Sequence, residues 1–155
     1  MSVLVEVEDH AWLTVPGLET LTKRVVAAVL AMDGNDHGKG EIAILFTSDE
    51  AMTEINAQWR GQNKPTNVLS FPAPAGIPVP RGEMPPIGDI VLAHGVVLRE
   101  ARDQGKTLAD HAVHLIVHGT LHLLGHEHET DAQAENMEEL EVKILKDLGI
   151  ADPYE

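Results

Sequence analysis

Residues 107–128 restrict the possible folds more than any other part of this chain. Their sequence, TLADHAVHLIVHGTLHLLGHEH, begins with Thr107 and Asp110 of a capping box and reaches Gly125 through a largely apolar stretch. A glycine in this place is a typical end of a helix. We therefore predict a helix that begins near residue 108, ends near Leu124 and lies centrally in the fold.

Shorter elements surround this helix. Apolar periodicity predicts four strands, over residues 3–8, 41–46, 67–71 and 88–93. It predicts four further helices, over residues 18–32, 48–59, 95–104 and 131–148. No repeat and no linker interrupts this series. The predicted fold is α+β, a small mixed sheet of about four strands packed with about five helices, and residues 1–155 are expected to form a single domain.

Two local features of this series stand out, the start of the second helix and a proline-rich loop. The segment Thr47-Ser48-Asp49-Glu50 is interpreted as a capping box that opens the second helix, with Trp59 on the apolar side of that helix beside Met52 and Ile55. Residues 72–86 contain six of the nine prolines and form a long loop before the fourth strand. Loops of this length are usually functional or mobile.

The composition excludes several classes of site. The chain has no cysteine, so it forms no disulfide and no thiolate metal site, and a nucleobase deaminase with cysteine ligands is disfavoured. The first residues lack the basic and apolar regions of a secretory signal, and the longest apolar run, residues 25–32, is too short to span a bilayer. We expect a cytoplasmic protein without a membrane partner.

The charge of the chain neither requires nor excludes a polyanionic partner. The formal net charge is −14, but the acidic residues concentrate toward the two ends, whereas residues 60–106 carry six basic and four acidic residues. Aromatic residues make up only 3% of the chain, so the sequence offers no obvious platform on which nucleobases could stack.

Three histidines have the spacing of metal ligands. His118 and His122 are four residues apart, so one face of the helix presents both imidazoles. Gly125 then ends the helix and lets the chain turn back with His128 as a third ligand. Three nitrogen ligands and one open position are typical of a catalytic zinc site. We predict one Zn²⁺ ion held by these three histidines and a water molecule; other divalent transition metals also accept imidazoles.

Two neighbouring histidines have different expected roles. His126 is a competing third ligand, but it lies two residues closer to the turn than His128. His114 falls on the same helical face as the predicted ligands, and we expect it to be a neighbour of the site or a hydrogen-bonded core residue.

The residue after the first histidine limits the chemistry. Zinc peptidases with the pattern HExxHxxGxxH use the glutamate there as a general base, and this chain has Gly119 instead. A phosphodiester substrate fits such a site better, because positioning and stabilisation of charge dominate phosphoryl transfer. Arg60 and Lys64, in the segment RGQNKPTNVLSFP at 60–72, are the predicted phosphate-binding cations.

The segments HGTLHLLGHEH at 118–128, WRGQNKPTNVLSFP at 59–72 and GDIVLA at 88–93 resemble the endoribonuclease YbeY family of bacterial rRNA maturation proteins. This resemblance, from about Ile44 to Tyr154, implies an α+β domain with a zincin-like site on a central helix. It implies cleavage of single-stranded RNA in 16S rRNA 3′ maturation and ribosome quality control. The implied partners are the small ribosomal subunit and assembly factors. Matched residue by residue, the ligands become His118, His122 and His128, and the catalytic basic residue becomes Arg60.

The match has two open points. Asn67 and Ser70 fall in the matched segment, but hydrogen bonding at a turn and at a strand end explains them equally well. Many members of the family have Tyr-Asp where this chain has His126-Glu127, which leaves the third ligand in place but changes the carboxylate beside it.

Two alternative functions also fit the sequence. The chain could be a ribosome-assembly binding factor whose metal is structural. It could also be a peptidase or another metal hydrolase that recruits a base such as Glu127 or Glu129. Loss of the fold in ligand variants would favour the first, and turnover of a protein substrate would favour the second.

Overall fold

A mixed four-stranded sheet forms the centre of the molecule. The computed structural model describes residues 2–33, 40–74, 76, 78–126, 129–150 and 152–154. The strands β1 (Ser2–Val7), β2 (Glu41–Thr47), β3 (Val68–Pro72) and β4 (Pro86–Ala93) lie in the order β1-β2-β4-β3. The first three strands in this order run parallel, and β3 pairs antiparallel with β4 at one edge.

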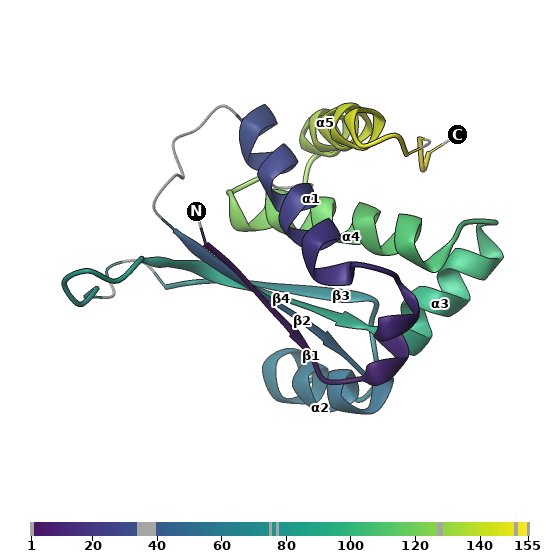
Figure 1. Cartoon of the computed structure of the whole chain (residues 1–155), viewed down its shortest axis with the longest axis horizontal. Helices are drawn as coiled ribbons and strands as arrows, with labels where there is room; N and C mark the ends of the chain where they lie inside the picture. Colours follow the sequence, from purple (N-terminus) through teal and green to yellow (C-terminus); the bar gives the residue numbers. More distant parts are fainter. Residues whose placement is uncertain are drawn as a thin grey trace.

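The described residues form five α-helices around this sheet. They are α1 (Leu18–Asp33), α2 (Asp49–Arg60), α3 (His94–Asp103), α4 (Leu108–Leu123) and α5 (Asp131–Asp147). Figure 1 shows α1, α4 and α5 on one face of the sheet and α2 on the opposite face. The α+β fold with about four strands and five helices is therefore confirmed, and a short 3₁₀ helix, η1 (His10–Thr14), adds to it. Within the described ranges no helix is long and apolar enough to span a membrane.

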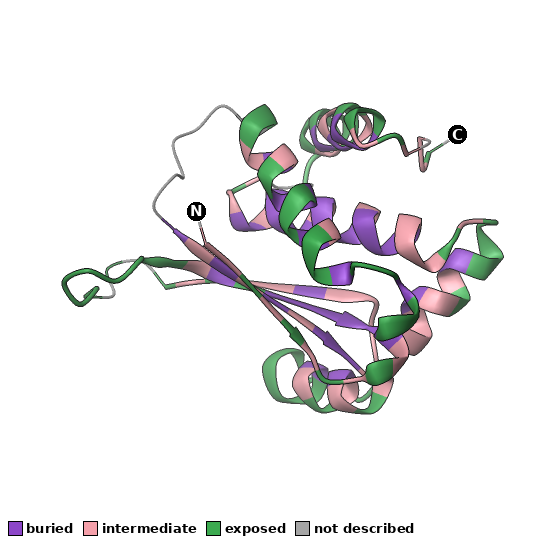
Figure 2. Ribbon diagram, viewed as in Figure 1, coloured by how far each residue is buried: buried purple, intermediate pink, exposed green. Residues whose placement is uncertain are grey.

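The central helix α4 lies between the sheet and the outer helices. Its ends follow the predicted signals, because the Thr107 hydroxyl accepts a hydrogen bond from the backbone of Asp110 and Leu124 caps the other end. Most of α4 is buried (Figure 2) in the larger apolar cluster, which also contains Trp12, Phe46 and Ile144. A smaller cluster of Met52, Leu69, Val91 and Ala93 joins α2 to the other face of the sheet.

Two predictions about the second helix are wrong. Ser48, not Thr47, caps α2 and accepts a hydrogen bond from the backbone of Ala51 at 3.2 Å. Thr47 instead extends β2 opposite Ala93, since the ladder continues one residue further than the apolar run. Trp59 is 66% exposed rather than buried with Met52, and its ring stands 6.0 Å from that of Phe71 in the edge strand β3.

Candidate metal centre

Two histidines of α4 face each other at the predicted site. His118 and His122 lie one helical turn apart, and their Nε2 atoms are separated by 3.1 Å. A tetrahedral zinc ion about 2.0–2.1 Å from each of two nitrogens holds them about 3.3 Å apart. The observed separation therefore fits two ligands of one ion.

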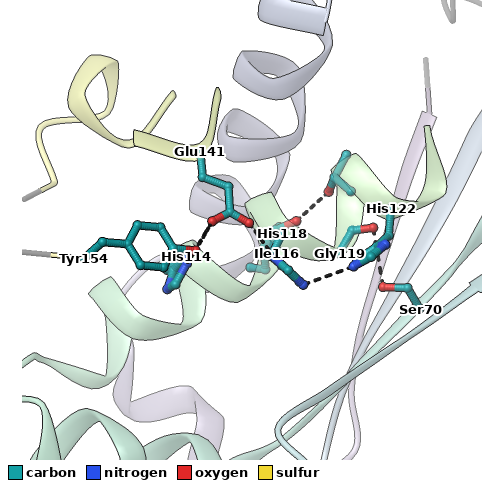
Figure 3. A network of polar contacts seen from close by, with 9 residues as sticks. Ser70, His114, Ile116, His118, Gly119, His122, Glu141 and Tyr154 are labelled. Atoms are coloured by element: carbon teal, nitrogen blue, oxygen red, sulfur yellow. Dashed lines mark hydrogen bonds and ion pairs between the residues drawn. The ribbon is translucent and has the colours of Figure 1, made fainter. Parts of the chain in front are cut away.

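A buried carboxylate orients the first of these histidines. Glu141 of α5 is 0% exposed, and its Oε1 lies 2.5 Å from Nδ1 of His118. Its Oε2 accepts a hydrogen bond from the hydroxyl of Tyr154 and lies 3.3 Å from Nε2 of His114 (Figure 3). A proton on Nδ1 of His118, donated to Glu141, leaves the lone pair of Nε2 directed toward His122. This is the tautomer that a metal ligand needs.

Hydrogen bonds keep the carboxyl of Glu141 ionised inside the protein. Burial alone would raise its pKa, but the donors on His114, His118 and Tyr154 outweigh burial and lower the pKa to about 2. Burial, followed by the hydrogen bond to Glu141 and its charge, raises the pKa of Tyr154 above the usual tyrosine range. Tyr154 therefore stays a neutral donor, and His114 is a hydrogen-bonded neighbour of the site.

The chain turns sharply after the second histidine. Gly125 has φ of +97°, a conformation that glycine adopts without the strain of a side chain. The amide of His126 donates to the carbonyl of Leu121, and the amide of Gly125 donates to that of His122, both at 3.0 Å. This pair of bonds is a Schellman motif. It ends α4 where the glycine predicted, and His126 lines the same cleft as the two histidines.

The third predicted ligand, His128, and the neighbouring Glu127 lie outside the described residues. Among the residues that the structure does describe, no three histidine, aspartate or glutamate side chains come together as a complete metal-binding group. The facing imidazoles of His118 and His122 nevertheless supply the nitrogen donors that zinc and similar ions prefer. With Glu141 fixing the tautomer of His118, the residues present fit a metal ion of this class.

The two histidines open into a cleft of about 720 Å³ between the end of α4 and β3. Arg60, the last residue of α2, lines the same cleft although it lies far from the histidines in sequence. His126 also lines it. Lys64, the other predicted phosphate-binding residue, is not among the lining residues. It is exposed in the loop before β3, where its backbone carbonyl accepts a hydrogen bond from Asn56.

Asn67 and Ser70 both line the cleft, and both also make hydrogen bonds that hold the local structure. The amide of Asn67 donates to Oε1 of Glu100 at 3.0 Å, while its Oδ1 accepts from the backbone of Val68. The hydroxyl of Ser70 donates to the carbonyl of Gly119 at 3.4 Å. These bonds join the start of β3 to α3 and its middle to α4.

Gly119 lies where α4 touches the sheet most closely. A Cβ atom at this position would stand 2.9 Å from Oγ of Ser70 and 3.3 Å from two carbons of Ile90. The position therefore faces β3 and β4, and it cannot hold a glutamate without displacing these neighbours. Packing thus accounts for the glycine, and the site has no general base at this position.

The network around Glu141 was not predicted from the sequence. Glu141 is separated from His118 by 23 residues and belongs to another helix, so the spacing of the histidines contains no sign of it. One signal was present in α5: Glu141 lies four residues after Met137 and three before Ile144, both of which are buried. A charged residue at a core position of an amphipathic helix indicates a buried polar contact.

Comparisons with known proteins identify the family. The family profile described as Endoribonuclease YbeY matches residues 5–149. A protein of Rhizobium etli named Endoribonuclease YbeY is 45% identical, with 100% of this chain and 94% of that protein covered. A protein of the same name from Bartonella henselae is 46% identical, with 96% and 93% covered.

The fold also has a counterpart among solved structures. A solution structure of a protein from Thermotoga maritima superposes with a TM-score of 0.58 at 23% identity, covering 94% of this chain and 91% of that one. This similarity concerns the fold alone. With the profile match over nearly the whole length and the two relatives above 40% identity, the chain belongs to the endoribonuclease YbeY family.

Proposed function

We propose that this protein is a metal-dependent endoribonuclease that cuts single-stranded RNA in the cleft between α4 and β3. The observation that carries the proposal is the meeting of His118, His122 and Arg60 in one cleft, with two imidazole nitrogens 3.1 Å apart. The relatives named Endoribonuclease YbeY support the same reaction class. Residues 1–155 form the single catalytic domain in this proposal.

His118, His122 and His128 would hold the metal ion, for which zinc is the first candidate. When bound, such an ion activates water near neutral pH and stabilises negative charge on oxygen. The chain itself supplies orientation, because Glu141 holds the ring of His118 by a 2.5 Å hydrogen bond. A site held in this way needs little rearrangement when substrate arrives.

Arg60 would bind the phosphate to be cleaved. Arg60 is exposed at the end of α2 and lines the cleft that contains the histidines. A planar guanidinium can donate two parallel hydrogen bonds to phosphate oxygens, and its positive charge favours the more negative transition state. Lys64, in the same exposed loop region, would add charge attraction to the incoming RNA without touching the cleaved phosphate.

The absence of a base next to His118 separates this site from a peptidase. A side chain at position 119 would press against Ser70 and Ile90, so α4 could hold a carboxylate there only by displacing these neighbours. Peptide cleavage would need that carboxylate to move a proton to the leaving amine. Phosphodiester cleavage depends more on the charge and positioning that Arg60 and the imidazoles supply.

A catalytic metal agrees better with this structure than a structural one. The larger apolar cluster joins the sheet to α1, α4 and α5 through buried hydrocarbon side chains, without His118 or His122. The side chain of His118 is 29% exposed and lines the cleft. Removing a ligand should therefore leave the fold intact.

The substrate in the cell would be ribosomal RNA in the cytoplasm, with 16S rRNA and the small ribosomal subunit as the expected target.

The proposal is tested by ligand and phosphate-site variants. His118→Ala and His122→Ala should lose bound metal, measured by elemental analysis, and should lose cleavage of an end-labelled single-stranded RNA. Arg60→Ala should keep the metal and lower the cleavage rate about 100-fold, as removal of a charge-stabilising group does. His10→Ala, at an exposed histidine of η1, is the matched control and should behave as the parent protein.

Further variants separate the alternatives. His128→Ala and His126→Ala, compared in the same metal assay, identify the third ligand, and we expect loss only with His128→Ala. Full RNA cleavage by metal-free His122→Ala protein would overturn the proposal. Loss of the cooperative thermal transition in that variant would favour the structural-metal alternative, and casein hydrolysis by the parent protein would favour a peptidase.

A further inference from the structure

A second hollow lies on the face of the sheet that α4 does not cover. It is an apolar groove of about 800 Å³ along β2, β4 and β3, bordered by the last turns of α2. Of the helices in the described part of the chain, α2 is the one that Figure 1 shows lying across this face of the sheet. The side chains that line the groove include Leu45, Ile55, Trp59 and Phe71, and its charged lining residues are Glu6 and Asp89.

Trp59 is the most unusual residue of this groove. The indole is 66% exposed, whereas the other tryptophan, Trp12, is fully buried. Its ring stands 6.0 Å from that of Phe71 at an angle of 56°. Large aromatic rings dominate the energy of core and interface packing when they are buried. An indole left in water at the edge of an apolar groove is a typical feature of a binding surface.

The groove and the metal cleft meet at the edge strand β3. Phe71 and Pro72 of the edge strand β3 line both hollows. Arg60, which lines the metal cleft, directly follows Trp59 at the end of α2. A polynucleotide whose phosphate lies at Arg60 can therefore pass over the edge of β3 and bring a neighbouring base to Trp59.

We propose that Trp59, supported by Phe71, is a stacking subsite for an unpaired nucleobase next to the phosphate held in the cleft. The inference rests on the proposed function and extends it by assigning a specificity role. Stacking on an aromatic ring accepts any base, since every base has a flat face, but the base must be unpaired. The subsite would thus select single-stranded RNA by a direct physical contact.

Charge limits the nucleotide to the Trp59 end of the groove. Glu6 of β1 and Asp89 of β4 are both exposed and line the remainder of it. Their carboxylates repel phosphate groups, so the RNA backbone is disfavoured further along the sheet. One base on Trp59, with its phosphate on the side of Arg60, satisfies both the apolar surface and the charge distribution.

The test compares RNA with bases and RNA without bases. Protein with its bound metal is titrated into dye-labelled heptaadenylate and into an abasic ribose-phosphate heptamer, both built with cleavage-resistant phosphorothioate linkages, and fluorescence anisotropy gives each dissociation constant. Trp59→Ala should weaken binding of heptaadenylate roughly tenfold, the usual effect of losing one stacked base. It should leave the abasic oligomer unchanged, and Trp59→Phe should recover most of the affinity.

The matched control is Leu13→Ala, which removes a 59% exposed apolar side chain outside both hollows. It should change neither dissociation constant. If Trp59→Ala weakens binding of both oligomers equally, or of neither, the stacking subsite is overturned. In the second case the groove would instead fit a protein partner. If the parent protein cleaves RNA while Trp59→Ala binds normally, only the subsite fails. If the parent protein with metal neither binds nor cleaves RNA, the proposed function fails with it.

Discussion

Glu141 determines how one imidazole of the candidate metal centre is used. A carboxylate buried to this extent is unfavourable unless its oxygens are hydrogen-bonded, and here three donors surround it. One of these donors is Nδ1 of His118, so the carboxylate decides which ring nitrogen has the proton. The same contact makes the Nε2 atom more basic and therefore a better metal ligand.

Replacing this carboxylate should weaken metal binding without removing a ligand. In Glu141→Gln the amide oxygen can still accept from His118 but has no negative charge, and its NH₂ group faces the donors of His114 and Tyr154. We expect the zinc affinity to fall about 10- to 100-fold, as with other partners of ligand histidines. Competition against a chromophoric chelator measures this change.

Glu138→Gln, on the exposed side of the same helix, is the control and should keep the parent affinity. Tyr154→Phe removes one donor to the carboxylate and should cause a smaller loss in the same direction. Parent affinity in Glu141→Gln protein would show that Glu141 does not orient the ligand.

At the scale of elements, local signals predicted the helices well because capping and turn bonds involve neighbouring residues. Thr107 and Gly125 both act at the helix ends where the sequence placed them. Contacts between elements could not be predicted in this way. Arg60 was assigned to the site only by its chemistry and by the family resemblance; that it lines the cleft of the histidines, and that Trp59 is exposed, depends on how α2 lies across the sheet.

Gly119, the residue after His118, takes part in a contact of this kind, between α4 and the strands β3 and β4. The sequence explained Gly119 by the base that is missing, whereas the structure adds that α4 approaches β3 and β4 too closely for a side chain. The hydroxyl of Ser70 is the nearest atom and also donates to the carbonyl of Gly119. The two residues therefore should not behave independently when they are mutated.

A double-mutant cycle on this contact is expected to be non-additive. Gly119→Ala forces a Cβ against Ser70 and Ile90, and overpacking of this kind costs about 1–3 kcal/mol of unfolding free energy, more than the gain in helix propensity of about 1 kcal/mol. In a Ser70→Ala background the closest atom is gone, so the same substitution should be less destabilising by 0.5 kcal/mol or more, a rough threshold for coupled neighbours. Urea denaturation of the four proteins gives the coupling free energy. Additive changes would mean that Ile90 alone limits the approach of the helix.

At the scale of the whole molecule, His111 in the first turn of α4 makes the free energy of unfolding depend on pH. His111 is only 3% exposed, and its Nε2 lies 2.9 Å from Oε1 of Glu100, which also binds Asn67. Burial lowers the pKa of His111 by more than the hydrogen bond to Glu100 raises it, and Lys106 and His114 add to the lowering. The folded protein therefore holds this ring neutral at a pH where an unfolded chain would protonate it.

Because the pKa of His111 is lower in the folded protein, the protein should lose stability in weak acid through this residue. An unfolded histidine binds a proton below about pH 6.5, so stability falls with pH from there until the folded form also protonates. Relative to His111→Gln, the parent protein should lose up to about 1.4 kcal/mol of unfolding free energy per pH unit between pH 6.5 and the lowered pKa. Urea denaturation in EDTA at pH 7.5 and pH 5.5 measures this difference, and His10→Gln, at an exposed histidine, should show none. A gap between parent and His111→Gln that stays constant with pH would mean that the folded protein accommodates the charged ring, with Glu100 as its counter-ion.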